Sequence, residues 1–220
     1  MSTNETLPIS VQLYSLRSLP ESFDVLLGQV AAIGYSGVET VGAHGLSGDE
    51  MSALLDKHGL KVTSGHYGLP LLQNDLGEVI AFNKAIDNDV IVVPALPDEM
   101  RAKNAQNWIM VGKLLDSLGA QCAAEGIRLQ YHNHWWEMDR FDGKLAIDWL
   151  LENASPENLG FEPDLAWIVR GGADPLDLLD RYSGRYPRVH AKDLAKPGEA
   201  NNDMGLADVG SGTLDWDALL

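Results

Sequence analysis

The segment QYHNHWWEMDRF, residues 130–141, brings together groups that can bind a metal or move a proton. His132 and His134 are separated by one residue, and Glu137 follows three positions after His134. On a β-strand alternate side chains share a face, so both imidazoles would point the same way. Taken alone, the segment is compatible with a metal site, an acid/base pair or an aromatic-rich strand end.

Two further residues of ligand type follow apolar, β-forming runs, namely Asp164 and His190, and Lys192 lies just beyond. Carboxylate and imidazole ligands without thiolate suit Mn²⁺, and also Mg²⁺, Co²⁺ or Zn²⁺. Such an ion would polarise a carbonyl or hydroxyl group of a substrate. Lys192 has a simpler alternative as an ion-pair partner of Asp164 or Asp193. We predict metal ligands at Glu137, Asp164 and His190, with His132 as the alternative to Glu137, and acid/base residues at His132, His134 and Lys192.

A second set of residues could line a substrate site, namely Gln12, His66, Trp136 and Trp167. Aromatic faces can stack on sugars, but they also pack protein cores. A lone histidine at a strand end, such as His66, is more often structural than functional. Glu39 and Glu162 have simple interpretations as well, as a strand-end residue and as an ion-pair partner of a nearby arginine.

Strand-like and helix-like segments alternate along the chain, which predicts a parallel sheet wrapped by helices. Several helices stop at a glycine just before the next strand, as in AAIGYSGVE and AAEGIRLQ. The predicted strands are 9–15, 37–41, 60–67, 90–96, 127–134, 159–167 and 186–194, and the predicted helices include 23–34, 48–59, 107–126 and 145–154.

The first predicted strand lacks the glycine-rich turn of a doubly wound nucleotide-binding sheet, so we predict a (β/α)8 TIM barrel over residues 1–220 as a single domain. In such barrels the chemistry gathers at the carboxyl ends of the strands, and the polar candidates fall there. We find seven βα units, so the last unit is expected to be missing. The exposed strand edges would then favour a homodimer.

The overall charge and composition limit the class of partner. The formal net charge is −16, which disfavours nucleic acid and anionic membranes. The single cysteine, Cys122, lies in a helical run and is expected to be buried. No segment has the pattern of a leader or a membrane span, so we expect a cytoplasmic protein.

The segments YHNHWWEM, FEPDLAWIVRGG and ADVGSGTLDW resemble the sugar phosphate isomerase/epimerase group of xylose-isomerase-like TIM barrels. The resemblance implies one divalent ion, often manganese, with Asp164 and His190 among its ligands. In many members the first ligand is a glutamate on the strand that here is LQYHNH, and this strand has no carboxylate. His132, His134 or Glu137 would replace it. The fourth ligand is usually a glutamate on the eighth strand.

The resemblance implies an isomerase or epimerase that removes a proton next to a metal-bound carbonyl of a ketose, keto-sugar or cyclitol. A related subgroup with the YHNH strand resembles keto-sugar or keto-inositol dehydratases and lyases, which is the main alternative. A non-catalytic sugar-binding barrel is a second alternative. Phosphodiester cleavage, known for apurinic endonucleases that share this barrel, is disfavoured by the negative charge.

Overall fold

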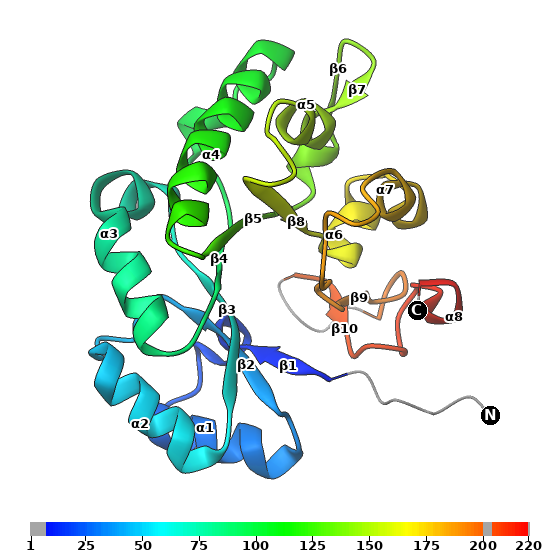
Figure 1. Cartoon of the computed structure of the whole chain (residues 1–220). Helices are drawn as coiled ribbons and strands as arrows, with labels where there is room; N and C mark the ends of the chain where they lie inside the picture. The colour runs from blue at the N-terminus through cyan, green and yellow to red at the C-terminus, as the bar shows by residue number, and fades with distance from the viewer. Residues whose placement is uncertain (1–7, 200–203, 220) are drawn as a thin grey trace, which may run out of the picture. The chain divides into compact units, whose positions relative to one another are not determined.

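The computed structural model describes residues 8–199 and 204–219. By its internal contacts the chain forms two compact units. Unit 1 consists of Met1–Val93 and Cys122–Arg128, and unit 2 consists of Pro94–Gln121 and Leu129–Leu220. Each unit is an α/β structure built on parallel strands (Figure 1).

Unit 1 contains four parallel strands that pair in chain order. The helices between them lie next to one another, α1 beside α2 and α2 beside α3 (Figure 1). Because the strands are parallel, their carboxyl ends share one edge of the sheet. The elements are β1 (Ser10–Gln12), α1 (Phe23–Ile33), β2 (Gly37–Val41), α2 (Gly48–His58), β3 (Lys61–His66), α3 (Leu69–Ala85) and β4 (Val90–Val93).

Local signals set the helix limits in unit 1. Ser47 and Glu50 form a capping box at the start of α2. Gly34 and Gly59 end α1 and α2 with φ of 109° and 66°, a conformation that glycine adopts at little cost. The predicted helix ends at these glycines are therefore confirmed. Helix α3 is not among the helices predicted from the spacing of apolar residues. Asp75 has non-helical backbone angles and kinks α3, so the spacing is not that of one continuous helix.

In unit 2, strand β5 (Arg128–His132) pairs in parallel with β8 (Leu159–Glu162). Arg128, the first residue of β5, belongs to unit 1. Two short antiparallel pairs accompany them, β6 with β7 and β9 with β10. The remaining elements are α4 (Ala105–Ala124, of which the last three residues belong to unit 1), β6 (Arg140–Phe141), β7 (Lys144–Leu145), α5 (Ala146–Glu152), α6 (Leu165–Arg170), α7 (Pro175–Arg181), β9 (Asp193–Leu194), β10 (Leu206–Ala207) and α8 (Trp216–Leu219).

Most predicted strands are longer than the observed ones, and the contacts of the first, sixth and seventh show why these end where they do. The first ends at Gln12, whose side-chain oxygen accepts from the N–H of Tyr14 and starts a short 3-10 helix. The sixth ends at Glu162, because Asp164 caps α6 through a hydrogen bond from the N–H of Trp167. The seventh is reduced to an isolated parallel bridge between Asp164 and His190, and its last residues belong to β9.

Other expectations about the chain can be compared with the structure. Cys122 is buried as predicted, and burial raises the pKa of its thiol to about 11. Among residues 8–199 and 204–219, no helix has the length and apolarity that crossing a membrane requires.

Two glycines let α4 approach the rest of unit 2. Gly112 and Gly119 are seven residues apart, which places them on the same helix face two turns apart. A Cβ atom at Gly112 would clash with the carbonyl oxygen of Leu150, and one at Gly119 with that of Asn158. Both neighbours are backbone atoms, so they cannot move aside as a side chain can.

We therefore predict that Gly119→Ala lowers the free energy of unfolding by about 1–3 kcal/mol, the usual cost of overpacking. Gly77→Ala is the matched control, because Gly77 lies in α3 with open space around its Cβ position. It should instead stabilise the protein by about 0.5–1 kcal/mol. Urea unfolding of both variants measures the difference, and equal effects would contradict the close approach.

Candidate functional site

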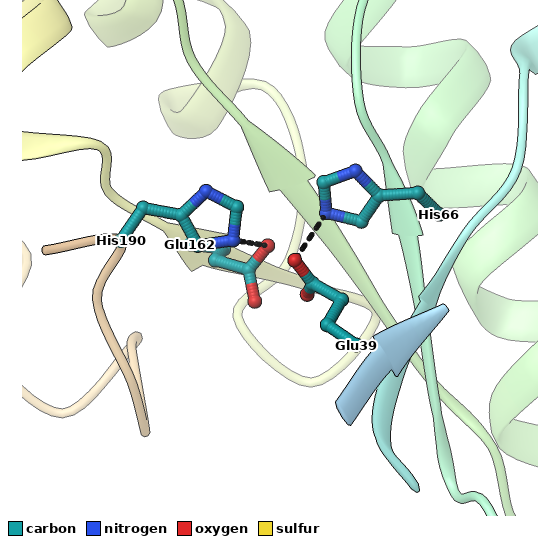
Figure 2. A group of neighbouring side chains, drawn as sticks. All are labelled: Glu39, His66, Glu162 and His190. Carbon is teal, nitrogen blue, oxygen red and sulfur yellow. Dashed lines mark ion pairs between the residues drawn. The ribbon is translucent and has the colours of Figure 1, made fainter. Parts of the chain in front are cut away.

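Polar side chains meet at the carboxyl ends of β1, β2 and β3 in unit 1. His66 Nε2 lies 3.0 Å from Glu39 Oε2, and its Nδ1 lies 3.3 Å from the side-chain nitrogen of Gln12. The Ser64 hydroxyl donates to the other oxygen of Glu39. Glu39, Ser64 and His66 are all buried. The structure thus joins Gln12 and His66, as the strand-end argument expected, and adds Glu39 as the acidic partner (Figure 2).

A second group lies at the carboxyl ends of β5 and β8 in unit 2. His190 Nε2 is 3.3 Å from Glu162 Oε2, the other ion pair drawn in Figure 2. His190 Nδ1 is 3.7 Å from Asp164 Oδ2, and His132 Nε2 is 3.9 Å from the same oxygen. Glu162 and Asp164 are fully buried and His132 is 3% exposed. Two imidazoles and two carboxylates therefore converge in a buried place.

Asp164 is held at the turn from β8 into α6. Its N–H donates to the side-chain oxygen of Asn133 at 2.9 Å, and its Oδ1 caps α6. Lys192 Nζ donates to Oδ2 at 2.5 Å. Burial alone would raise the pKa of Asp164, but the hydrogen bond from His190 and the charge of Lys192 outweigh it and leave that pKa below its usual value. Asp164 is therefore an anion, and Lys192 is its ion-pair partner.

The donor atoms of unit 2 suit a divalent ion. His132, Asp164 and His190 each offer one ligand atom, and these atoms lie within 4.8 Å of one another. Ligands at about 2.1 Å from an ion are separated by about 3–4 Å, close to the 3.7 and 3.9 Å found here. A nitrogen and oxygen donor set without thiolate fits Mn²⁺, Mg²⁺, Co²⁺ or Zn²⁺.

Glu137, a predicted ligand, has other partners. The Tyr131 hydroxyl donates to Oε1 at 2.6 Å, and the His134 N–H donates to Oε2 at 2.8 Å. Among the described residues Glu137 is not in the group of converging donors, whereas His132, its stated alternative, is. Burial raises the pKa of Glu137 to about 7, although both hydrogen bonds oppose the shift.

For Glu162 the sequence predicts only an ion pair with a nearby arginine, whereas in the structure its Oε2 lies 3.3 Å from His190 Nε2. The period-two alternation of a strand could have found it, since Glu162 and Asp164 are two residues apart and share a face. Predicted side chains also gather around His134. Its ring lies 4.3 Å from that of Trp136 and 6.0 Å from that of Trp167, between ring centroids.

Asp193, next to Lys192, organises the segment that follows. Its carboxylate accepts hydrogen bonds from the N–H groups of its neighbour Leu194 and of four residues across the turn, and from the Trp216 indole. Burial alone would raise its pKa, but these donors lower it to about 2. Asp193 thereby ties the backbone that follows Lys192 to residues 210–214 and to the Trp216 side chain. The four N–H donors across the turn come from Gly210, Gly212, Thr213 and Leu214.

We predict that Asp193→Asn destabilises the protein by about 2 kcal/mol or more, because charge-assisted hydrogen bonds are lost. A carboxyl whose folded pKa is depressed stabilises the fold above its unfolded pKa, near 3.8, and loses this effect as pH falls toward 2. The gap between wild type and variant should therefore narrow from pH 4 to pH 2. Asp217→Asn, at an exposed position, is the control. Denaturant titrations measure the free energy of unfolding at each pH. A difference between wild type and Asp193→Asn that stays constant from pH 4 to pH 2 would refute the stabilising role of the ionised Asp193 carboxylate.

Glu137 yields the opposite pH dependence. Its folded pKa of about 7 exceeds the ordinary value of 4.5, so its stabilisation is complete below pH 4.5 and is lost as pH rises through 7. Over that window the free energy of unfolding should fall by about 3 kcal/mol in the wild type relative to Glu137→Gln, which cannot ionise. A free energy of unfolding that changes with pH in the same way in both proteins between pH 4.5 and 8 would contradict the raised pKa of Glu137.

Comparison with known proteins places these groups in context. A sequence model described as the xylose isomerase-like TIM barrel matches residues 27–220. An inosose dehydratase from Lacticaseibacillus casei is 23% identical over 192 residues, which is 79% of this chain and 64% of that protein. The chain thus spans less than two thirds of the length of this curated relative.

Solved structures share the fold. A sugar phosphate isomerase/epimerase from Parabacteroides distasonis superposes with a TM-score of 0.80 and 21% identity, covering 100% of this chain and 83% of that one. The probable 3-DHS dehydratase involved in petrobactin synthesis in Bacillus anthracis gives a TM-score of 0.72 and 16% identity, covering 97% and 87%. The predicted barrel class is confirmed by these matches.

Proposed function

The chain belongs to the xylose isomerase-like TIM barrel family, and we propose that it is a divalent-metal-dependent enzyme that removes a proton next to a carbonyl group of a keto-sugar or cyclitol. The observation that carries the proposal is the convergence of His132, Asp164 and His190 in unit 2, where His132 and Asp164 are buried and the His190 side chain is 12% exposed. Buried charged and imidazole groups in this number are costly unless they serve a ligand or pair with one another.

In this proposal His132, Asp164 and His190 hold the ion, with Glu162 beside His190 as its carboxylate partner. A bound divalent ion polarises the substrate carbonyl and so acidifies the neighbouring C–H. Glu162 orients His190 by pairing with its Nε2, in the way that carboxylates commonly orient metal-binding histidines. His132 then takes the position predicted for Glu137, whose oxygens are engaged by Tyr131 and His134.

Two side chains are proposed to move protons. Lys192 holds an ammonium group 2.5 Å from Asp164, where it can donate a proton to a departing or developing oxygen. His134 is the proposed base, because its ring lies 5.1 Å from that of His132 and histidine is the side chain most often used as a base near neutral pH. Gln12 and His66, which lie together in unit 1, stay predictions as substrate-binding residues.

Two outcomes of this proton removal are possible. An isomerase or epimerase returns the proton to carbon, whereas a dehydratase expels a hydroxyl group from the next carbon. We favour dehydration of a keto-inositol, because the curated relatives are inosose dehydratases. The net charge of −16 supports a small neutral or metal-bound substrate over nucleic acid.

The metal assignment predicts that the wild type binds one Mn²⁺ and that Asp164→Asn weakens binding by about 100-fold or more. Asparagine keeps the oxygen that caps α6, so the fold is preserved while the charge is lost. Asp177→Asn is the control, since Asp177 is an exposed residue of α7 that pairs with Arg181. Isothermal titration calorimetry measures all three. Equal Mn²⁺ affinity in the wild type and Asp164→Asn would refute the assignment.

The reaction itself is tested with an inosose and Mn²⁺ in deuterated water. Dehydration produces a conjugated product that absorbs in the ultraviolet, whereas isomerisation incorporates solvent deuterium without such a product. Metal binding without either signal, over a panel of keto-sugars and keto-inositols, would favour a non-catalytic sugar-binding protein.

A further inference from the structure

His134 lies in a stack of aromatic and cationic side chains within unit 2. Its imidazole faces the Trp136 indole with 4.3 Å between ring centroids and 7° between planes. Trp167 lies 6.0 Å away, inclined by 21°. The guanidinium carbon of Arg101 is 4.0 Å from the Trp136 centroid, and that of Arg170 is 4.5 Å from the Trp167 centroid. The His134 ring is therefore within 21° of parallel to both indoles, and an arginine lies against each indole.

The backbone of His134 is fixed as well. Its N–H donates to Glu137 Oε2 at 2.8 Å, while the Tyr131 hydroxyl holds the other oxygen of that carboxyl. Glu137 is fully buried, so water does not compete for these hydrogen bonds. Because both the backbone and the ring of His134 are held, the imidazole has little freedom to change rotamer.

The stack also limits what Trp136 can do. Arg101 and His134 each lie about 4 Å from its ring centroid. Arg101 is itself held by Leu96, whose carbonyl accepts from its Nε at 2.7 Å, and by Asp98. Two groups this close to the centroid occupy ring surface that a stacked sugar would need. This geometry favours a role in holding His134 over the substrate-stacking role expected from the sequence.

The geometry points to Trp136, braced by Arg101, as a positioning residue that fixes the plane of the His134 ring for proton transfer. The inference rests on the proposed function for its catalytic consequence. The ring nitrogens of an imidazole exchange hydrogen bonds along the edge of the ring, in its plane. A fixed plane thus selects the direction in which His134 meets the substrate, and orientation of this kind is a major part of enzymatic rate.

The test compares Trp136→Leu, Trp136→Phe and the control Trp149→Phe. Trp149 lies on α5, where its indole donates to the carbonyl oxygen of Phe141, outside the stack. Circular dichroism and thermal melting check folding. Carbon-edited NMR of the histidine rings, with His134 identified by His134→Gln, reports the stack directly, since ring currents of the indoles shift the imidazole C–H signals upfield.

We expect Trp136→Leu to move the His134 signals downfield and to lower kcat by about 10²-fold with an unchanged KM, as misorientation does. Trp136→Phe should restore much of both, because a flat ring still covers the imidazole, and Trp149→Phe should match the wild type. The inference would be overturned by unshifted His134 signals in a folded Trp136→Leu protein, or by a raised KM with an unchanged kcat. The raised KM would indicate that Trp136 stacks on the substrate.

The two readouts separate this inference from the proposed function. A wild type without turnover refutes the proposed function and the catalytic part of the inference together. A wild type that turns over substrate, with Trp136→Leu showing the same kcat, refutes only the positioning role. If Trp136→Leu fails to fold, the spectra and kcat of Trp136→Phe decide, because intermediate shifts and rates are then expected and wild-type values would overturn the inference.

Discussion

The chemistry of unit 2 depends on one fully buried carboxylate, that of Asp164. An ionised group without water must be compensated locally, and Asp164 is compensated by Lys192, His190 and the N-terminus of α6. The same contacts join three segments distant in sequence, because the N–H of Asp164 also bonds to Asn133 beside β5. A single residue therefore fixes both the electrostatics of the site, through its carboxylate, and the positions of the chains around it, through its backbone N–H and its cap of α6.

Two further buried acids, Asp193 and Glu137, support the chain around Asp164 in different ways. Asp193 is surrounded by N–H donors and remains ionised, so it anchors the segment that carries Lys192. Glu137 accepts from the Tyr131 hydroxyl and the His134 N–H, but burial outweighs the hydrogen bonds and raises its pKa toward neutrality. The difference follows from the balance between burial and hydrogen bonds, since burial disfavours the charged form of a carboxylate and each hydrogen bond to it favours that form. Both acids position their neighbours, and Glu137 does so for His134.

The aromatic residues of the YHNHWWEM segment follow the same logic. The Trp136 indole stacks on His134 and contacts the guanidinium group of Arg101, so its contacts hold other side chains of the protein. Trp135 is the more exposed indole, at 44%, and lies across the edges of its neighbours Trp136 and Trp167. Adjacent residues of one type thus have different environments, which no local pattern distinguishes.

The alternation of strands and helices, the glycines that end α1 and α2, and the strand ends at which Gln12, His66 and His132 lie can be predicted from the amino-acid sequence. These features depend on local periodicity and backbone preference, which act over a few residues. Three other features follow only from the folded structure: Glu162 pairs with His190, Glu137 accepts from Tyr131, and the last predicted strand is reduced to one bridge at His190. The partner of a buried charge is chosen by packing between segments far apart in the chain, so periodicity cannot specify it.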